Sequence, residues 1–119
     1  MKKVLVIEDN ETNLYLMRTI LKKYGCHVIE AQDGYSGVEL AVAESPDLIL
    51  MDIQLPILDG YGATKKIRSI EKTKNIPIIA ITSYAMVGDK EKTLRAGCNV
   101  YIEKPIDPKS FIEELKKFL

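Results

Sequence analysis

Tryptophan is absent from this 119-residue sequence, histidine occurs once, at His27, and cysteine occurs twice, at Cys26 and Cys98. The cysteines match no metal or redox spacing, and no histidines cluster near them, so we expect neither a Cys/His metal site nor a disulfide. Both are interpreted as small, buried or half-buried thiols in a reducing cytoplasm. His27 opens an expected strand and is interpreted as structural or exposed.

No charge of one sign predominates. The 17 Lys and Arg residues balance 17 Asp and Glu residues, so the formal net charge is zero, and no run of like charges is longer than two residues. Basic clusters supply most of the attraction of proteins for nucleic acids. The balance therefore argues against a nucleic-acid partner.

Long apolar runs are also missing. The run that begins at Val4 stops after four residues at Glu8-Asp9, far short of the core of a signal peptide. No stretch approaches the length needed to cross a bilayer. We therefore expect a soluble, cytoplasmic protein without membrane contact.

The length fits a single domain over residues 1–119, and the chain has no linker, internal repeat or low-complexity segment. A domain of this size can bury a self-sufficient core. We therefore expect one domain with no separate output domain. It is either a stand-alone protein, which the initial Met1 and the absence of a linker favour, or a domain cut from a longer chain.

Short runs rich in Val and Ile alternate with helical patterns five times along the chain. The expected strands are Lys3–Glu8, His27–Ala31, Leu48–Met51, Ile76–Ile81 and Val100–Ile102. Apolar residues at helical spacing predict helices from Leu14 to Tyr24, Tyr35 to Val42 and Ala63 to Ile70, and a fourth helix is expected from about Gly88 to Ala96. The last helix should begin with Asp107 as N-cap and Pro108 at its first position, and its apolar stripe runs from Phe111 to Leu119. Five such units predict a doubly wound α/β fold, a flavodoxin-like three-layer sandwich whose parallel sheet has the order 2-1-3-4-5.

Polar residues stand where four of these strands end. Strand one ends at Glu8-Asp9, strand three at Asp52, strand four at Thr82 and strand five at Lys104. Ligands of open parallel sheets bind beyond the carboxyl ends of the strands, where the strand order reverses. The sequence therefore predicts three carboxylates, a hydroxyl and an ammonium in one crevice.

This set of groups suits phosphoryl transfer. Three clustered carboxylates repel one another unless a counter-charge is present. Mg²⁺ supplies one with oxygen ligands and retained waters, so one or two protein carboxylates suffice. A metal on one side and Lys104 on the other would neutralise a phosphoryl group transferred to an oxygen of Asp52, giving an acyl phosphate.

The whole chain resembles a response regulator receiver domain of the CheY-like type. The resemblance rests on five motifs in the family's order and spacing: Val6-Ile7-Glu8-Asp9-Asn10, Leu50-Met51-Asp52-Ile53-Gln54-Leu55-Pro56, Asp59-Gly60, Ile81-Thr82 and Lys104-Pro105. The segments around Asn13 and Thr82-Ser83-Tyr84 resemble stand-alone and hybrid-kinase receivers most.

The resemblance implies a role for each site residue. Asp52 would be the phosphoacceptor, Lys104 would pair with the phosphoryl group, and Thr82 would hydrogen-bond to it. Asp9, Asp52 and the backbone carbonyl of Gln54 would bind Mg²⁺, or Mn²⁺ in its place, with Glu8 acting through water. Lys104-Pro105 resembles the family's cis peptide.

The resemblance also implies a switch and its partners. Thr82 and Tyr101 would form the switch, and Gln54 and Tyr84 would tune the rate of dephosphorylation. The phosphoryl group would come from a histidine kinase or a histidine phosphotransfer protein. The signal would reach a protein target through the face of helix four, strand five and helix five, where Met86 and Val87 offer apolar contacts. The protein would be a signalling switch and not an enzyme, monomeric or weakly dimeric when phosphorylated.

Three other readings fit parts of the sequence. A flavodoxin-like cofactor binder should carry a phosphate loop after strand one, but that loop begins with Glu8-Asp9 and would repel a phosphate. A dehalogenase-like phosphatase should carry a second carboxylate two residues after Asp52, where Gln54 stands. A receiver-shaped module that is never phosphorylated would be distinguished by a phosphorylation assay.

Overall fold

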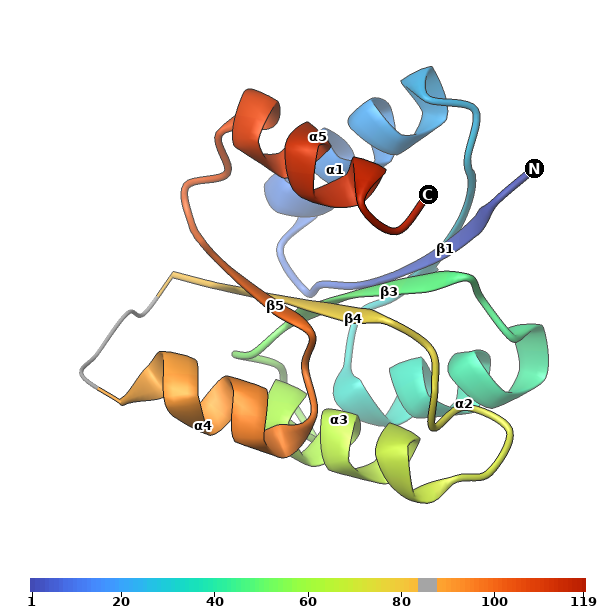
Figure 1. The fold of residues 1–119 in the computed structure, drawn as a ribbon, viewed down its shortest axis with the longest axis vertical. Helices are drawn as coiled ribbons and strands as arrows, with labels where there is room; N and C mark the ends of the chain where they lie inside the picture. Colours follow the sequence, from blue (N-terminus) through green and yellow to red (C-terminus); the bar gives the residue numbers. More distant parts are fainter. Residues whose placement is uncertain (84–87) are drawn as a thin grey trace.

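The computed structural model describes residues 1–83 and 88–119, in which strands and helices alternate along the chain (Figure 1). The strands are β1 (Lys3–Ile7), β2 (His27–Ala31), β3 (Leu48–Asp52), β4 (Ile78–Thr82) and β5 (Val100–Glu103). The helices are α1 (Glu11–Lys23), α2 (Gly34–Glu44), α3 (Gly60–Ser69), α4 (Asp89–Ala96) and α5 (Pro108–Lys116).

The strands form one parallel sheet in the order β2-β1-β3-β4-β5, which confirms the predicted topology. The register places Ile7 beside Met51, and Asp52 beside Ile81. The carboxyl ends of β1, β3 and β4 therefore lie next to one another along one edge of the sheet.

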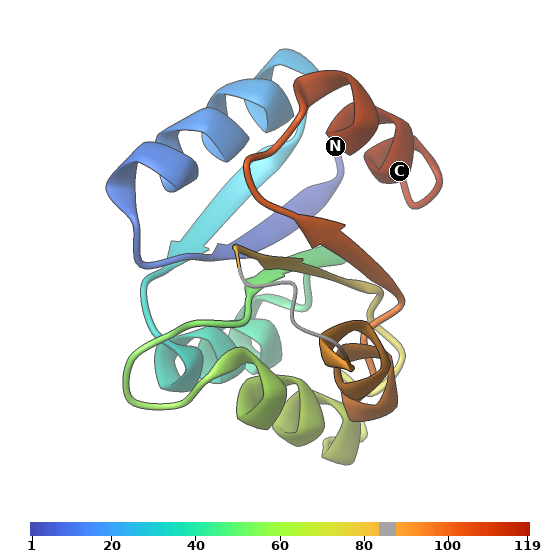
Figure 2. The same ribbon diagram turned by 90° about the vertical axis from the view of Figure 1, so that its left-hand side faces the viewer.

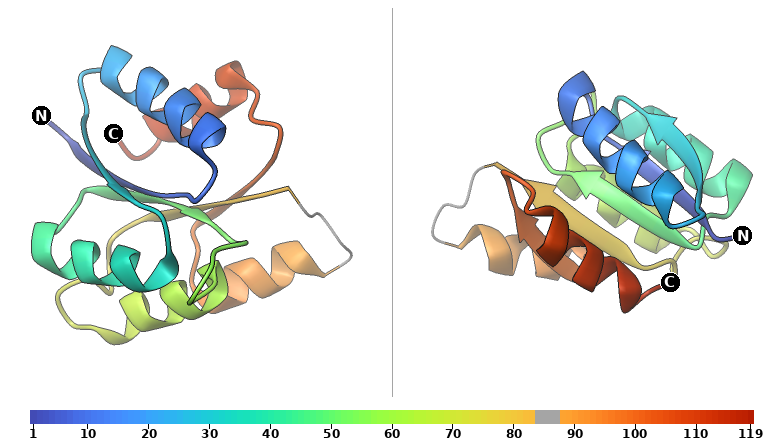
Figure 3. Two further views of the ribbon diagram at one scale, coloured as in Figure 1. Left: turned by 180° about the vertical axis from the view of Figure 1, so that it is seen from behind. Right: turned by 90° about the horizontal axis from the view of Figure 1, so that it is seen from above.

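Helices cover both faces of the sheet, giving the expected three layers. Helices α1 and α5 lie on one face and α2, α3 and α4 on the other, as Figure 1 and both views of Figure 3 show. Alternate residues of a strand pack into two different cores, one on each face of the sheet. Val4 and Val6 belong to the first core, and Leu5 and Ile7 belong to the second. All four are fully buried, as expected for strands covered on both faces.

Side-chain caps start three helices directly after the strand-end loops. Asn10, Asp33 and Asp59 each accept a hydrogen bond from a backbone amide three residues on, at 2.7 to 3.0 Å. Such caps satisfy amides that the first helical turn leaves unpaired. Asp107 occupies the predicted cap position, but its carboxylate accepts from the Ser110 hydroxyl at 2.8 Å and makes no cap bond to the backbone.

Several predicted boundaries shift by a few residues. Strand β4 begins at Ile78 and not at Ile76, because the intervening Pro77 has no amide to donate to the sheet. Strands β3, β4 and β5 each extend one residue further than predicted. Helix α5 ends at Lys116, short of the predicted Leu119.

Two tyrosines that fit the helical spacing lie at the surface. Tyr24 is 49% exposed and Tyr35 is 56% exposed, so neither belongs to the core. The expectation that the cysteines are buried, unbridged thiols is confirmed for both Cys26 and Cys98. Within residues 1–83 and 88–119, no helix has the length and apolar character needed to span a bilayer.

Candidate functional site

Three carboxylates gather at the carboxyl edge of β1 and β3. Glu8 and Asp9 follow β1, and Asp52 ends the neighbouring strand β3. One oxygen from each lies within 4.8 Å of the others. Glu8 and Asp52 are buried, at 0% and 4% exposure, whereas Asp9 is exposed. The convergence predicted from the strand order is therefore present.

Lys104 reaches this cluster from the end of β5. Its Nζ lies 2.8 Å from Glu8 Oε1 and 3.2 Å from Asp52 Oδ2, so one ammonium forms ion pairs with both buried carboxylates. The Lys104 backbone amide donates to the Thr82 carbonyl at 2.7 Å. The peptide bond from Lys104 to Pro105 is cis, as the sequence led us to expect.

The pKa values of the buried pair follow from this geometry. Burial, and then a hydrogen bond with Asp52, raise the pKa of Glu8 to about 7, against the opposing effect of Lys104. Burial acts to lower the pKa of Lys104, but its hydrogen bond to Glu8 and the negative charges around it outweigh burial and raise it. Lys104 therefore stays charged at neutral pH, and Glu8 is poised to release its proton near neutrality.

The residues after Asp52 and Thr82 hold the acceptor in place. The backbone amide of Gln54 donates to Asp52 Oδ1 at 3.1 Å, and the Ser83 hydroxyl donates to the side-chain oxygen Oε1 of Gln54 at 3.1 Å. Because Lys104 contacts Oδ2, the two oxygens of Asp52 have different partners. Thr82 is buried at the end of β4, beside Glu103 in the sheet register.

The cluster opens into a polar hollow of about 340 Å³. Its lining comes from the carboxyl ends of β1, β3, β4 and β5 and from the first turn of α1, and consists of Asp9, Asn10, Asn13, Asp52, Gln54, Ser83 and Lys104. Figure 2 shows this side of the molecule, with the loop 53–59 projecting at its left-hand margin. The candidate site is therefore a solvent-accessible crevice with a buried acidic floor.

Magnesium fits this donor set. Hard carboxylate oxygens are the ligands that Mg²⁺ prefers, and the three carboxylates carry more negative charge than Lys104 alone can neutralise. Asp9 is exposed, so a bound ion would keep several of its waters.

Tyr101 lies on β5, beside Ala80 of β4, and is half-buried. Burial, followed by the nearby charges of Glu103 and Asp89, raises its pKa. The role of Tyr101 in the switch stays a prediction. Tyr84, Met86 and Val87, named for phosphate lifetime and for partner binding, lie outside the described residues.

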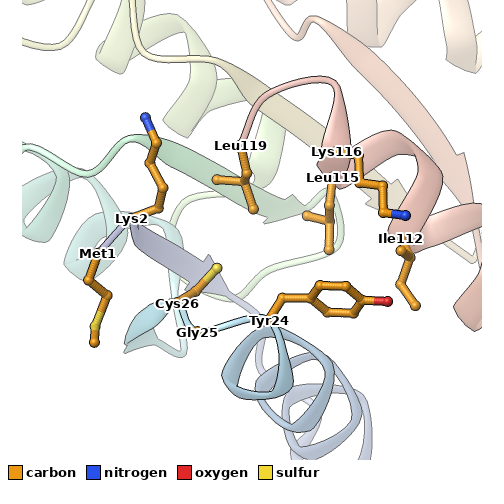
Figure 4. Close-up of a pocket in the computed structure, with 9 residues that line it drawn as sticks. All are labelled: Met1, Lys2, Tyr24, Gly25, Cys26, Ile112, Leu115, Lys116 and Leu119. Carbon is orange, nitrogen blue, oxygen red and sulfur yellow. The ribbon is translucent and has the colours of Figure 1, made fainter.

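A second hollow, of about 390 Å³, lies near the amino ends of β1 and β2 (Figure 4). It is lined by Met1, Lys2, Tyr24, Gly25, Cys26, Ile112, Leu115, Lys116 and Leu119. The Cys26 thiol points into it, and burial raises the pKa of that thiol, which disfavours the reactive thiolate. None of these lining residues has an acidic side chain, so this hollow lacks the carboxylate cluster of the acidic crevice.

Comparison with known proteins agrees with the site. A model of the response regulator receiver domain matches residues 4–116. The polar-differentiation response regulator DivK of Brucella ovis is 43% identical over 118 residues, which cover 99% of this chain and 96% of that protein. The corresponding protein of Brucella anthropi is 42% identical over the same length.

Solved structures of receiver domains are also similar to this chain. The receiver domain of a sensor histidine kinase from Pseudomonas aeruginosa, crystallised with magnesium in its active-site cleft, superposes with a TM-score of 0.91 at 38% identity, covering 98% of this chain and 96% of that one. The receiver domain of Ssk1 from Saccharomyces cerevisiae, solved with the histidine phosphotransfer protein Ypd1, gives 0.90 at 31% identity, covering 98% and 88%.

The chain belongs to the response regulator receiver domain family, the phosphorylated switches of two-component signalling. Within that family it is a response regulator similar to DivK. Its acidic pocket of Glu8, Asp9 and Asp52 is the receiver site for Mg²⁺ and the phosphorylated aspartate. It is a signalling switch and not an enzyme in the ordinary sense.

Two features of this site were not predicted from the sequence. The ion pair between Glu8 and Lys104 was not expected, because the sequence assigned Lys104 to the phosphoryl group and Glu8 to the metal waters. The second is the backbone of Ile57, which has a positive φ of 69° in the loop after Asp52. The only available signal was its position after Pro56 in a turn-forming segment.

Proposed function

We propose that Asp52 accepts a phosphoryl group from the phosphohistidine of a histidine kinase or a histidine phosphotransfer protein. The observation that carries this proposal is the asymmetric setting of its carboxylate, with Oδ2 beside the Lys104 ammonium and Oδ1 beside the Gln54 amide. A carboxylate oxygen attacks phosphorus, the phosphorus–nitrogen bond breaks as the oxygen–phosphorus bond forms, and the products are aspartyl phosphate and imidazole.

The residues around Asp52 position and neutralise the incoming group. Lys104 pairs with a phosphoryl oxygen, and this new ion pair replaces part of its present contact with Asp52. Thr82, buried at the end of β4, donates its hydroxyl to a second oxygen. Gln54 and, in our proposal, Tyr84 border the path of the hydrolytic water.

Asp9, Asp52 and the Gln54 carbonyl are the proposed Mg²⁺ ligands, with Glu8 acting through water. The bound ion supplies charge neutralisation of the phosphoryl oxygens. Mn²⁺, which also takes oxygen ligands, would serve in its place.

We further propose that the signal leaves through the face formed by α4, β5 and α5, by way of Thr82 and Tyr101. Support comes from the way α4 is attached: of its eight residues only Thr93 and Ala96 are buried. A helix with so few buried contacts shifts at little cost in free energy. Tyr101 lies beneath it, close enough to Asp89 for that charge to raise its pKa.

The proposed working unit is a single receiver over residues 1–119, monomeric or weakly dimeric when phosphorylated, that acts in the cytoplasm on protein partners. The complex of Ypd1 with the related Ssk1 receiver supports a phosphohistidine protein as donor. The two free cysteines agree with a reducing compartment.

The test is phosphorylation by acetyl phosphate, followed by intact mass. We expect one phosphate per chain in Mg²⁺ and none after chelation. Phosphorylation that proceeds equally well without a divalent ion would contradict the proposed chemistry.

A further inference from the structure

Ile57 combines two unfavourable features in the loop between β3 and α3. Its backbone φ is +69°, in the left-handed region that β-branched residues rarely adopt. Its side chain is 85% exposed, and among the described large apolar side chains only the terminal Met1, at 95%, is more exposed. Neither the backbone conformation nor the exposure is favourable for isoleucine.

The strain comes from a tight turn. The Leu58 amide donates to the Pro56 carbonyl at 2.7 Å, which closes a three-residue γ-turn with Ile57 at its centre. Glycine or asparagine would adopt this conformation at lower cost. The turn therefore does not explain why isoleucine stands at this position.

Core packing does not explain the residue either, although the rest of the loop is firmly anchored. Ile53 and Leu55 are buried, and the Gly60 amide donates to the Ile53 carbonyl at 2.9 Å. The loop also lies against α2 so closely that a Cβ at Gly34 would be 1.8 Å from the Leu58 carbonyl oxygen. The anchored loop thus holds the Ile57 side chain out in solvent.

The place of this loop indicates what covers it. Its first residues touch the acceptor, since the Gln54 amide binds Asp52 Oδ1, and Gln54 also lines the polar hollow. A protein that brings a phosphohistidine to Asp52 must cover this edge of the sheet. An apolar side chain on a rigid loop suits such an interface, because little freedom is lost when it is buried.

We propose that Ile57 is a docking anchor for the phosphodonor protein and inserts into an apolar pocket beside the donor's phosphohistidine. This inference rests on the proposed function of Asp52. The strained and exposed side chain lowers the stability of the free protein, and its burial in the complex repays that loss. A downstream target and a second copy of this chain are the other occupants that the experiment separates.

The test compares Ile57→Asn with wild type by three measurements. Asparagine tolerates the left-handed conformation and removes the apolar surface, so we expect a higher urea midpoint for unfolding. Phosphorylation by acetyl phosphate should keep its wild-type rate, because Ile57 does not contact the acceptor. In the cells that encode the protein, the phosphorylated fraction, measured on a phosphate-retarding gel, should fall about tenfold, which corresponds to about 1.4 kcal/mol of lost contact.

Two further variants separate the causes. Ile57→Leu keeps an apolar group at this position and should retain most of the cellular phosphorylation. If Ile57 acted only through its backbone conformation, an apolar group would not be needed for phosphorylation. Tyr24→Asn removes another exposed large side chain, 49% exposed beside the second hollow, and should leave the cellular phosphorylation unchanged.

Each other outcome overturns the inference. An Ile57→Asn chain phosphorylated normally in cells shows that the donor does not use this anchor, even if target binding or self-association is lost. An equal loss with acetyl phosphate shows that Ile57 shapes the acceptor site itself. A wild-type chain that accepts no phosphate from acetyl phosphate refutes the proposed function, and one that carries none in cells refutes the donor and this contact together.

Discussion

Glu8 and Lys104 form a buried ion pair across the acidic pocket, with Nζ of the lysine 2.8 Å from Oε1 of the glutamate. The pair joins the end of β1 to the end of β5, on opposite sides of β3 in the sheet. Lys104 also contacts Asp52 at 3.2 Å, so the ammonium is shared between a carboxylate that we assign to the metal waters and the acceptor. Substitutions at Glu8 should therefore change the electrostatic environment of Asp52.

The raised pKa of Glu8 predicts a pH-dependent stability of the metal-free protein. Its pKa is 4.5 in the unfolded chain and about 7 in the folded one, so the folded state binds more protons between these values. The free energy of unfolding should therefore fall as pH rises from about 4.5 to 7, by on the order of 1–3 kcal/mol.

Urea denaturation in chelator across this range measures the effect. Glu8→Gln removes the titrating group, and its unfolding free energy should depend less on pH. An identical pH dependence in the wild-type and Glu8→Gln proteins would show that Glu8 does not hold its proton in the folded state.

Asp9→Asn should weaken Mg²⁺ binding while keeping or raising stability in chelator. Asp9 is one of the three clustered carboxylates, and among the described residues of the metal-free protein Lys104 alone offsets their repulsion, so removal of the Asp9 charge relieves part of it. Calorimetric titration with Mg²⁺ and thermal unfolding in chelator measure the two effects. Glu39→Gln, on the exposed surface of α2, is the matched control and should change neither. Normal Mg²⁺ affinity in Asp9→Asn would remove Asp9 from the ligand set.

Gly34→Ala should destabilise the protein by roughly 2–3 kcal/mol, because the added Cβ would lie 1.8 Å from the Leu58 carbonyl oxygen. The loop after Asp52 would have to move away from α2. Gly25→Ala is the comparison, since φ is +77° there but no atom lies within 4 Å, and it should cost about 1 kcal/mol. Chemical denaturation of both variants gives the order, and a smaller cost at Gly34 would mean that the loop yields easily.

Thr82→Ala should uncouple phosphorylation from the output face. The acceptor and Lys104 remain, so Asp52 should still be phosphorylated, although the loss of one hydroxyl donor slows the reaction several-fold. Amide chemical shifts that move at Tyr101 on phosphorylation of the wild type should stay in place in the variant. Equal shifts at Tyr101 in both proteins would mean that the signal reaches β5 by another route.

The fold and the composition of the site could be predicted because they depend on patterns that the sequence displays directly. Runs such as Leu48–Met51 are apolar throughout, as strands buried on both faces must be, and the polar residue that ends each run marks the edge of the sheet. Asp52 and Lys104 could therefore be brought together from strand order alone.

The remaining features depend on side-chain orientations and backbone angles that residue type does not determine. Whether Lys104 pairs with Glu8, Asp52 or both is decided by side-chain geometry over a few ångströms. The conformation of Ile57 runs against the preference of isoleucine, so propensity predicts the wrong region of φ. Tyr24 and Tyr35 fit helical spacing but lie at the end and the start of their helices, where neighbouring elements no longer cover them.

The most direct test of the central claim is the location of the phosphate. Wild type and Asp52→Asn are incubated with acetyl phosphate and Mg²⁺, and intact mass gives the number of phosphates on each. We expect one phosphate on wild type and none on Asp52→Asn, because the amide that replaces the carboxylate is not a nucleophile. An unchanged phosphate on Asp52→Asn would contradict the assignment of Asp52 as the acceptor.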